Sequence, residues 1–257
     1  MPETFLYNIN AEYICLFLML GMFALFYLGR QLHKNKKTDI QDMGALTSFL
    51  FALLGLLLAF TFGMSGSRFD ARRGLVVQAA NNMRTAILRA DLYSEDSVRK
   101  AFKADLKEYV QARINWFDAG RSLELVEQAK NESQRLSMKL WNRAAELARD
   151  PKNMVASQQM IPALNAVIEV AVAREGATKA IVPEPILYLL FIMTWVTSLM
   201  AGYATSIQKK FNYLAVIGFI VLVGCVIFII LDLDRPRRGL ITNVAVNQFI
   251  RNLLQMF

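Results

Sequence analysis

The sequence predicts an all-α polytopic membrane protein in which two transmembrane hairpins flank a helical domain outside the membrane. The first observation is four apolar runs without an internal Lys or Arg, each of roughly the 20 residues that cross a bilayer core as a helix. The second is the charged stretch between the second and third runs, whose apolar residues recur at helical spacing. The apolar runs cover residues 13–29, 43–64, 186–205 and 213–233.

These runs divide the chain into three expected domains. They are an N-terminal hairpin over 1–64, a helical extramembrane domain over 65–184 and a C-terminal hairpin with a short tail over 185–257. Residues 1–10 lack the basic start of a cleaved signal peptide, so the first run is expected to be a permanent span. Pro183-Glu184-Pro185 predicts the start of the third span, because proline suits the first turn of a helix but not its interior.

The middle domain is expected to consist of helices. Apolar residues recur near helical spacing over 98–117, and the sequence Asp-Ala-Gly at 118–120 predicts a break. The pattern resumes over 123–150 and again over 154–180. No segment shows the sustained alternation of polar and apolar residues that is typical of a strand.

A stripe of small residues follows the second span and continues beyond it as polar residues. Its steps of three or four residues place it on one face of a helix. No proline interrupts residues 43–92, so we expect one long helix that leaves the bilayer and enters the domain. The stripe consists of Ser48, Ala52, Gly55, Ala59, Gly63, Ser67, Asp70, Gly74, Gln78 and Asn81.

Two interpretations of this stripe stay open. Small residues let a neighbouring membrane helix approach closely, so the stripe fits a helix seam within one subunit. A change from small to polar at the membrane exit also fits the lining of a central axis in an oligomer. Phe60 and Phe62 flank the stripe near that exit, and aromatic rings in a narrow passage can gate it by dewetting. Their alternative role is contact with lipid or with the core.

Both segments that leave the membrane on the domain side mix carboxylates with arginines. Carboxylates at a membrane boundary are costly unless they are paired or hydrated. We therefore expect the aspartates, including Asp70, to pair with neighbouring arginines or to meet permeating ions, whereas the arginines also suit interfacial anchoring. The candidate membrane-edge charges are Arg68, Arg72, Arg73, Asp232, Asp234 and Arg235.

Composition argues against several other classes of protein. The formal net charge of +8 fits basic flanks that anchor helices against anionic headgroups. The aromatic–basic repeat of single-strand binders is absent, so nucleic acid is not an expected partner. Cys15 and Cys225 both lie in apolar runs, which excludes a disulfide framework and a zinc site. No nucleophile–base pair, metal-ligand cluster or phosphate loop appears, so we expect no enzyme activity, catalytic residue, metal or cofactor.

Two charged segments carry a resemblance to a known family. The stretch from Phe62 to Leu92 and the sequence Asp-Arg-Pro-Arg-Arg-Gly at 234–239 resemble the bacterial bestrophin-like domain family, which is largely of unknown function. The arrangement of two and two spans matches as well, so the resemblance covers nearly the whole chain. Relatives are expected to carry an acidic residue near Gln78 or Ala79, which this chain lacks. More distantly, the layout is similar to that of bestrophins, which are pentameric anion channels whose second span lines the pore.

The orientation in the membrane stays open between two predictions. The connections within the hairpins hold six basic residues, and residues 1–10 hold none, so the positive-inside rule places the middle domain outside the cell. The bestrophin layout implies the opposite orientation, which we favour. The six basic residues are Arg30, Lys34, Lys36, Lys37, Lys209 and Lys210.

The resemblance implies an oligomeric ion channel, anion-conducting, with the second transmembrane helix at its axis. Its expected partners are the lipid bilayer, other copies of the chain in a homo-oligomer (a pentamer by analogy) and small inorganic ions. Its expected location is the bacterial inner membrane. The alternative is a non-conducting membrane sensor or scaffold whose helical domain binds a partner.

Overall fold

The computed structural model describes residues 5–34, 41–206, 213–237, 239–241 and 244–257. Within these ranges the chain is helical and contains no strand, which confirms the predicted all-α fold. The basic connections at 35–40 and 207–212, on which the orientation prediction partly depends, lie outside the described residues. The chain divides into two compact units, the first formed by Met1–Phe69 and Ile181–Arg235, the second by Asp70–Ala180 and Pro236–Phe257.

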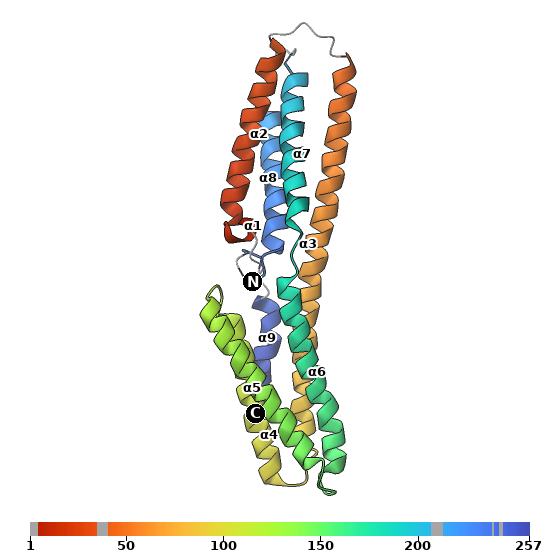
Figure 1. Cartoon of the computed structure of the whole chain (residues 1–257), viewed down its shortest axis with the longest axis vertical. Helices are drawn as coiled ribbons and strands as arrows, with labels where there is room; N and C mark the ends of the chain where they lie inside the picture. The colour runs from red at the N-terminus through yellow and green to blue at the C-terminus, as the bar shows by residue number, and fades with distance from the viewer. Residues whose placement is uncertain (1–4, 35–40, 207–212, 238, 242–243) are drawn as a thin grey trace. The chain divides into compact units, whose positions relative to one another are not determined.

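The first unit contains the membrane-spanning helices, which lie lengthwise beside one another in Figure 1. Helix α2 packs against both α7 and α8. Within the described residues, four stretches are long and apolar enough to cross a membrane. Two of them, Gly44–Ala90 and Met154–Ala204, are far longer than a bilayer core requires, so only part of each can span it. The elements of this unit are α1 (Phe5–Asn8), α2 (Ala11–Lys34), the first part of α3 (Gln41–Ala90), α7 (Glu184–Ala204) and α8 (Tyr213–Leu233).

Large apolar side chains cover the outer surface of α2 and α8. Phe17 and Leu20 of α2 are 66% and 61% exposed, and Leu214 of α8 is 78% exposed. Such a surface is costly in water and suits the hydrocarbon region of a bilayer. The inner sides of the same helices form the core of the unit, around Leu18 and Ile227.

Glycines allow α2 and α7 to lie unusually close together. A Cβ atom added at Gly202 would collide with the carbonyl of Phe26, and one added at Gly29 with the carbonyl of Leu199. At Gly21 the ring of Trp195 would lie 2.6 Å from such an atom. This backbone approach is the use that membrane helices make of small residues.

The second unit is a helical domain with its own core. It contains the rest of α3, α4 (Asp96–Asp118), α5 (Leu123–Leu147), α6 (Met154–Lys179), α9 (Val244–Asn252) and the short 3₁₀ helix η1 (Leu253–Met256). The break expected at 118–120 is a turn in which Gly120 has φ = 53°, a value that favours glycine. The inclusion of α9 and η1 in this unit was not anticipated from the sequence. Central core residues are Met83, Ile87, Phe102, Leu106, Leu140 and Met160.

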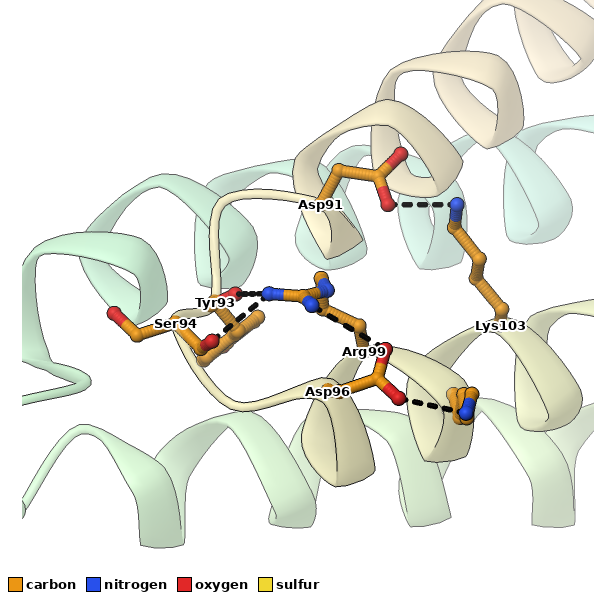
Figure 2. A network of polar contacts seen from close by, with 7 residues as sticks. Asp91, Tyr93, Ser94, Asp96, Arg99 and Lys103 are labelled. Atoms are coloured by element: carbon orange, nitrogen blue, oxygen red, sulfur yellow. Dashed lines mark hydrogen bonds and ion pairs between the residues drawn. The ribbon is translucent and has the colours of Figure 1, made fainter.

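A polar network closes the turn between α3 and α4, as Figure 2 shows. One nitrogen of Arg99 donates to the carbonyls of Tyr93 and Ser94, each at 2.9 Å. The Lys103 ammonium lies 2.6 Å from Asp91, which joins α4 to the turn that ends α3. A hydrogen bond from Lys100 is the main cause that lowers the pKa of Asp96, which begins α4. Carbonyls of the turn that follows α3 thus accept hydrogen bonds from the next helix.

Candidate functional site

All ten stripe residues predicted from the sequence lie on the exposed side of α3 in a single chain. In the first unit the glycine positions Gly55 and Gly63 have open space where a side chain would begin. In the second unit the same holds at Gly74, and Gln78 is exposed beyond it. The described part of the chain therefore provides no neighbour that covers the stripe.

The opposite side of α3 is buried against its own subunit. Leu54 and Thr61 are 2% and 1% exposed in the first unit, and Met83 and Ile87 are 2% and 1% exposed in the second. The Thr61 hydroxyl donates to the carbonyl of Leu57 at 2.8 Å, which satisfies it within its own helix. Helix α3 thus has one covered face of core residues and one open side, on which the stripe runs beside exposed large apolar residues such as Phe49 and Leu56.

The aromatic residues predicted as gate candidates are also exposed. Phe60 is 64% exposed and Phe62 is 44% exposed. By contrast, Phe51 packs edge-on against Phe219 of α8, with ring centroids 5.1 Å apart. The rings near the membrane exit are therefore free to meet a ligand, lipid or another subunit, whereas the Phe51 ring packs within its own subunit.

Three of the predicted membrane-edge charges make contacts within the first unit. The Asp234 carboxylate accepts from the Val182 backbone N–H at 2.7 Å and lies 3.8 Å from the Arg68 guanidinium. The Arg235 guanidinium donates to the carbonyls of Leu6 and Ile9 at 2.7 and 2.6 Å. Asp234 is 6% exposed and Arg235 is 4% exposed, so these contacts pair groups that would be costly to bury alone.

Glu184 joins this edge and was not singled out from the sequence. Its carboxylate accepts from the Leu6 backbone N–H at 2.8 Å and from the Tyr188 hydroxyl at 3.4 Å. A carboxylate in the first turn of a helix that follows a proline is a common N-terminal signal, and here it also holds the N-terminal segment. This carboxylate therefore has a structural role.

The remaining predicted charges are distributed differently. Asp232 is 4% exposed near the end of α8, whereas Asp70 is exposed and lies on the stripe. Arg73 is exposed, but Arg72 is 4% exposed and lines a cavity in the second unit. The predicted charges therefore differ in their surroundings: some are buried and others are exposed. Among the described residues, no group of His, Cys, Asp or Glu side chains is arranged to hold a metal ion.

Comparison with known proteins identifies relatives of this chain. A family model described as the Bestrophin-like domain matches residues 15–242. A variant of a bacterial bestrophin homologue from Klebsiella pneumoniae matches with a TM-score of 0.72 at 16% identity, over 96% of this chain and 97% of that chain. A second structure of that homologue matches with a TM-score of 0.68 at 16% identity, over 95% and 97%. No curated protein sequence matches.

Proposed function

Because the chain belongs to the bestrophin-like domain family, whose fold is that of a membrane channel, we propose that this integral membrane protein is an oligomeric channel that conducts anions. In this proposal α3 of each copy turns its stripe toward a central axis. The number of copies is five, by analogy with bestrophins, and the location is the bacterial inner membrane. The observation that carries the proposal is the exposure of the whole stripe in the single chain.

The chemical character of the stripe separates it from a lipid-facing surface. The exposed sides of α2 and α8 carry large apolar residues such as Phe17 and Leu214. The stripe on α3 instead carries Ala, Gly and Ser within the span and Asp, Gln and Asn beyond it. Small residues gain little from contact with lipid, but they leave room for a passage or for the close approach of a second copy.

The polarity of the stripe favours ions as the occupants of such an axis. Its membrane part consists of small residues, and larger polar side chains begin at Asp70, where the second unit begins. Phe60 and Phe62 stand beside the apolar part, where a ring of such side chains would form a hydrophobic constriction. The formal net charge of +8 favours anions over cations near the protein.

The proposal is tested by recording from the purified protein in planar bilayers. We expect a conductance whose reversal potential follows the chloride gradient. Replacing Phe60 or Phe62 by alanine is expected to increase the conductance several-fold, because a shorter side chain widens the constriction and lowers the cost of wetting it. The matched control is Phe23→Ala, which removes a half-exposed ring from α2, outside the stripe, and should leave the conductance unchanged.

Absence of conductance over a range of salts and voltages, with protein that is folded and oligomeric, would contradict the proposal. The sensor or scaffold interpretation would then take its place. That interpretation requires a stable partner on the helical domain and ion flux that Phe60→Ala leaves unchanged.

A further inference from the structure

The second unit contains a partly open cavity of about 190 Å³ that three arginines line. We call it the arginine pocket. Three different segments supply its arginines: Arg72 from α3, Arg174 from α6 and Arg237 from the segment before α9. Trp116 and Phe117 of α4 form part of its wall. Among the described lining residues there is no Asp or Glu.

The aromatic rings hold the guanidinium groups in place. The Arg237 guanidinium lies 4.3 Å from the centroid of the Trp116 ring, and the Arg174 guanidinium lies 4.6 Å from that of Phe117. Arg113, on the same helix as both rings, lies 5.0 Å from Trp116. Such cation–π contacts orient the arginines, but they do not neutralise the charges.

Arg174 is a deeply buried arginine of this pocket whose terminal hydrogen-bond donors are not satisfied within the described part of the chain. It is 3% exposed, and neither of its terminal nitrogens has a hydrogen-bond partner among the described residues. Burial is the main cause that lowers its pKa, and the nearby positive charge of Arg113 acts in the same direction. A buried guanidinium with unmade hydrogen bonds, among like charges, is a costly arrangement for a domain to keep.

We infer that the arginine pocket is a binding site for a small organic anion, in which a phosphate or carboxylate group is attached to an apolar body. Guanidinium groups bind these oxyanions through paired hydrogen bonds, and Arg174, which lines the cavity, has two terminal nitrogens that no described residue uses. Leu75, Val76 and Phe117 line the same cavity and would contact the apolar part. A single inorganic ion would leave most of this lining without contact.

The inference concerns the extramembrane unit and does not depend on ion conduction. Two sources can supply the chemistry, namely a soluble metabolite or the headgroup of an anionic lipid. Phenyl phosphate serves as the soluble probe and short-chain phosphatidylglycerol as the lipid probe. Benzyl alcohol, which has a similar apolar body without the charge, is the neutral control.

Binding is measured by calorimetry on the full-length protein in a neutral detergent after removal of bound lipid. We expect saturable binding of at least one charged probe and none of benzyl alcohol. Arg174→Gln should weaken binding at least about tenfold, because a charge-assisted hydrogen-bond partner is lost, and Arg174→Lys should weaken it less. Arg135→Gln is the matched control, since Arg135 lies on the surface of α5 and pairs with Glu132.

A second measurement distinguishes a ligand site from a purely structural arginine. Without any probe, Arg174→Gln should melt at the same temperature as the wild type or higher, because it removes an unpaired buried charge. Adding the probe should then raise the melting temperature of the wild type only. The inference is overturned if neither charged probe binds, if Arg174→Gln binds as well as the wild type, or if the variant melts lower in the absence of probe.

Discussion

At the scale of single residues, some buried charges in the described part of the protein are paired with opposite charges and others are not. Asp105 of the second unit is 5% exposed and lies 2.7 Å from both Lys139 and Arg143, so two cations satisfy one carboxylate. The Arg174 guanidinium has no such carboxylate among the described residues. Paired charges of the first kind stabilise a fold, whereas an unpaired buried charge is more readily explained by a ligand.

The half-buried pair between α5 and α6 predicts a pH-dependent stability. The Lys130 ammonium donates to Glu175 at 2.8 Å, and this hydrogen bond is the main cause that lowers the pKa of Glu175 from its ordinary value of 4.5. A carboxylate with a lowered folded-state pKa adds stability above its unfolded-state pKa, and the contribution disappears as the pH falls through the folded-state pKa. Glu175→Gln should therefore destabilise the protein by up to about 1 kcal/mol at pH 7.

Thermal melting of the detergent-solubilised protein across pH checks this prediction. The gap between wild type and Glu175→Gln should begin to shrink near pH 4.5 and disappear once the pH is below the lowered folded-state pKa of Glu175. Glu132→Gln is the control, because Glu132 pairs with Arg135 on an exposed surface and such pairs contribute little. A gap that is independent of pH would mean that the substitution acts through packing rather than charge.

At the scale of elements, α2 and α7 depend on their glycines for contact. Gly202 faces the carbonyl of Phe26 so closely that no side-chain atom fits between them. We expect Gly202→Ala to push the helices apart and to destabilise the first unit by about 1–3 kcal/mol, as overpacking usually does. The measurement is the melting temperature in detergent together with the yield of folded protein.

Gly218 of α8 offers the matched control for this element. A Cβ atom there would meet nothing within 4 Å. Gly218→Ala should leave the melting temperature unchanged or raise it, because alanine favours a helix over glycine. If both substitutions behave alike, close packing at Gly202 is not what holds α2 against α7.

At the scale of the whole molecule, the open face of α3 predicts how copies of the chain meet. If the stripe lines a central axis, then Ser67 of one copy lies near Ser67 of the others. In a Cys225→Ala background, Ser67→Cys should form covalent dimers with a short bismaleimide. Gln128→Cys, on the exposed side of α5, should not. Cys15 is buried and can be kept.

Light scattering on the detergent-solubilised protein gives the number of copies independently. We expect a mass of several chains, and five by analogy with bestrophins. A monomer, or a simple dimer that does not crosslink at Ser67, would contradict a central axis. The exposed stripe would then be a surface for a different partner.

Much of this architecture follows from local patterns in the sequence. The apolar runs and the helical spacing predicted an all-α membrane protein with four spans, which the structure confirms. The uninterrupted stretch 43–92 and the break at 118–120 correspond to α3 and to the turn at Gly120. These features depend on residues a few positions apart, so helical periodicity and turn chemistry are enough to predict them.

Contacts between distant residues required the folded chain. From the sequence alone, several arginines could pair with Asp234. In the folded chain its carboxylate lies near the Arg68 guanidinium and accepts a hydrogen bond from the Val182 backbone N–H. Arg72 stood among the membrane-edge charges, yet it lines a cavity with Arg174, about a hundred positions away. Which face of α3 is covered depends in the same way on how the helices pack. Sequence periodicity determines that a helix has two faces, whereas only the packing of the other helices determines which of them is left open for a partner or an ion.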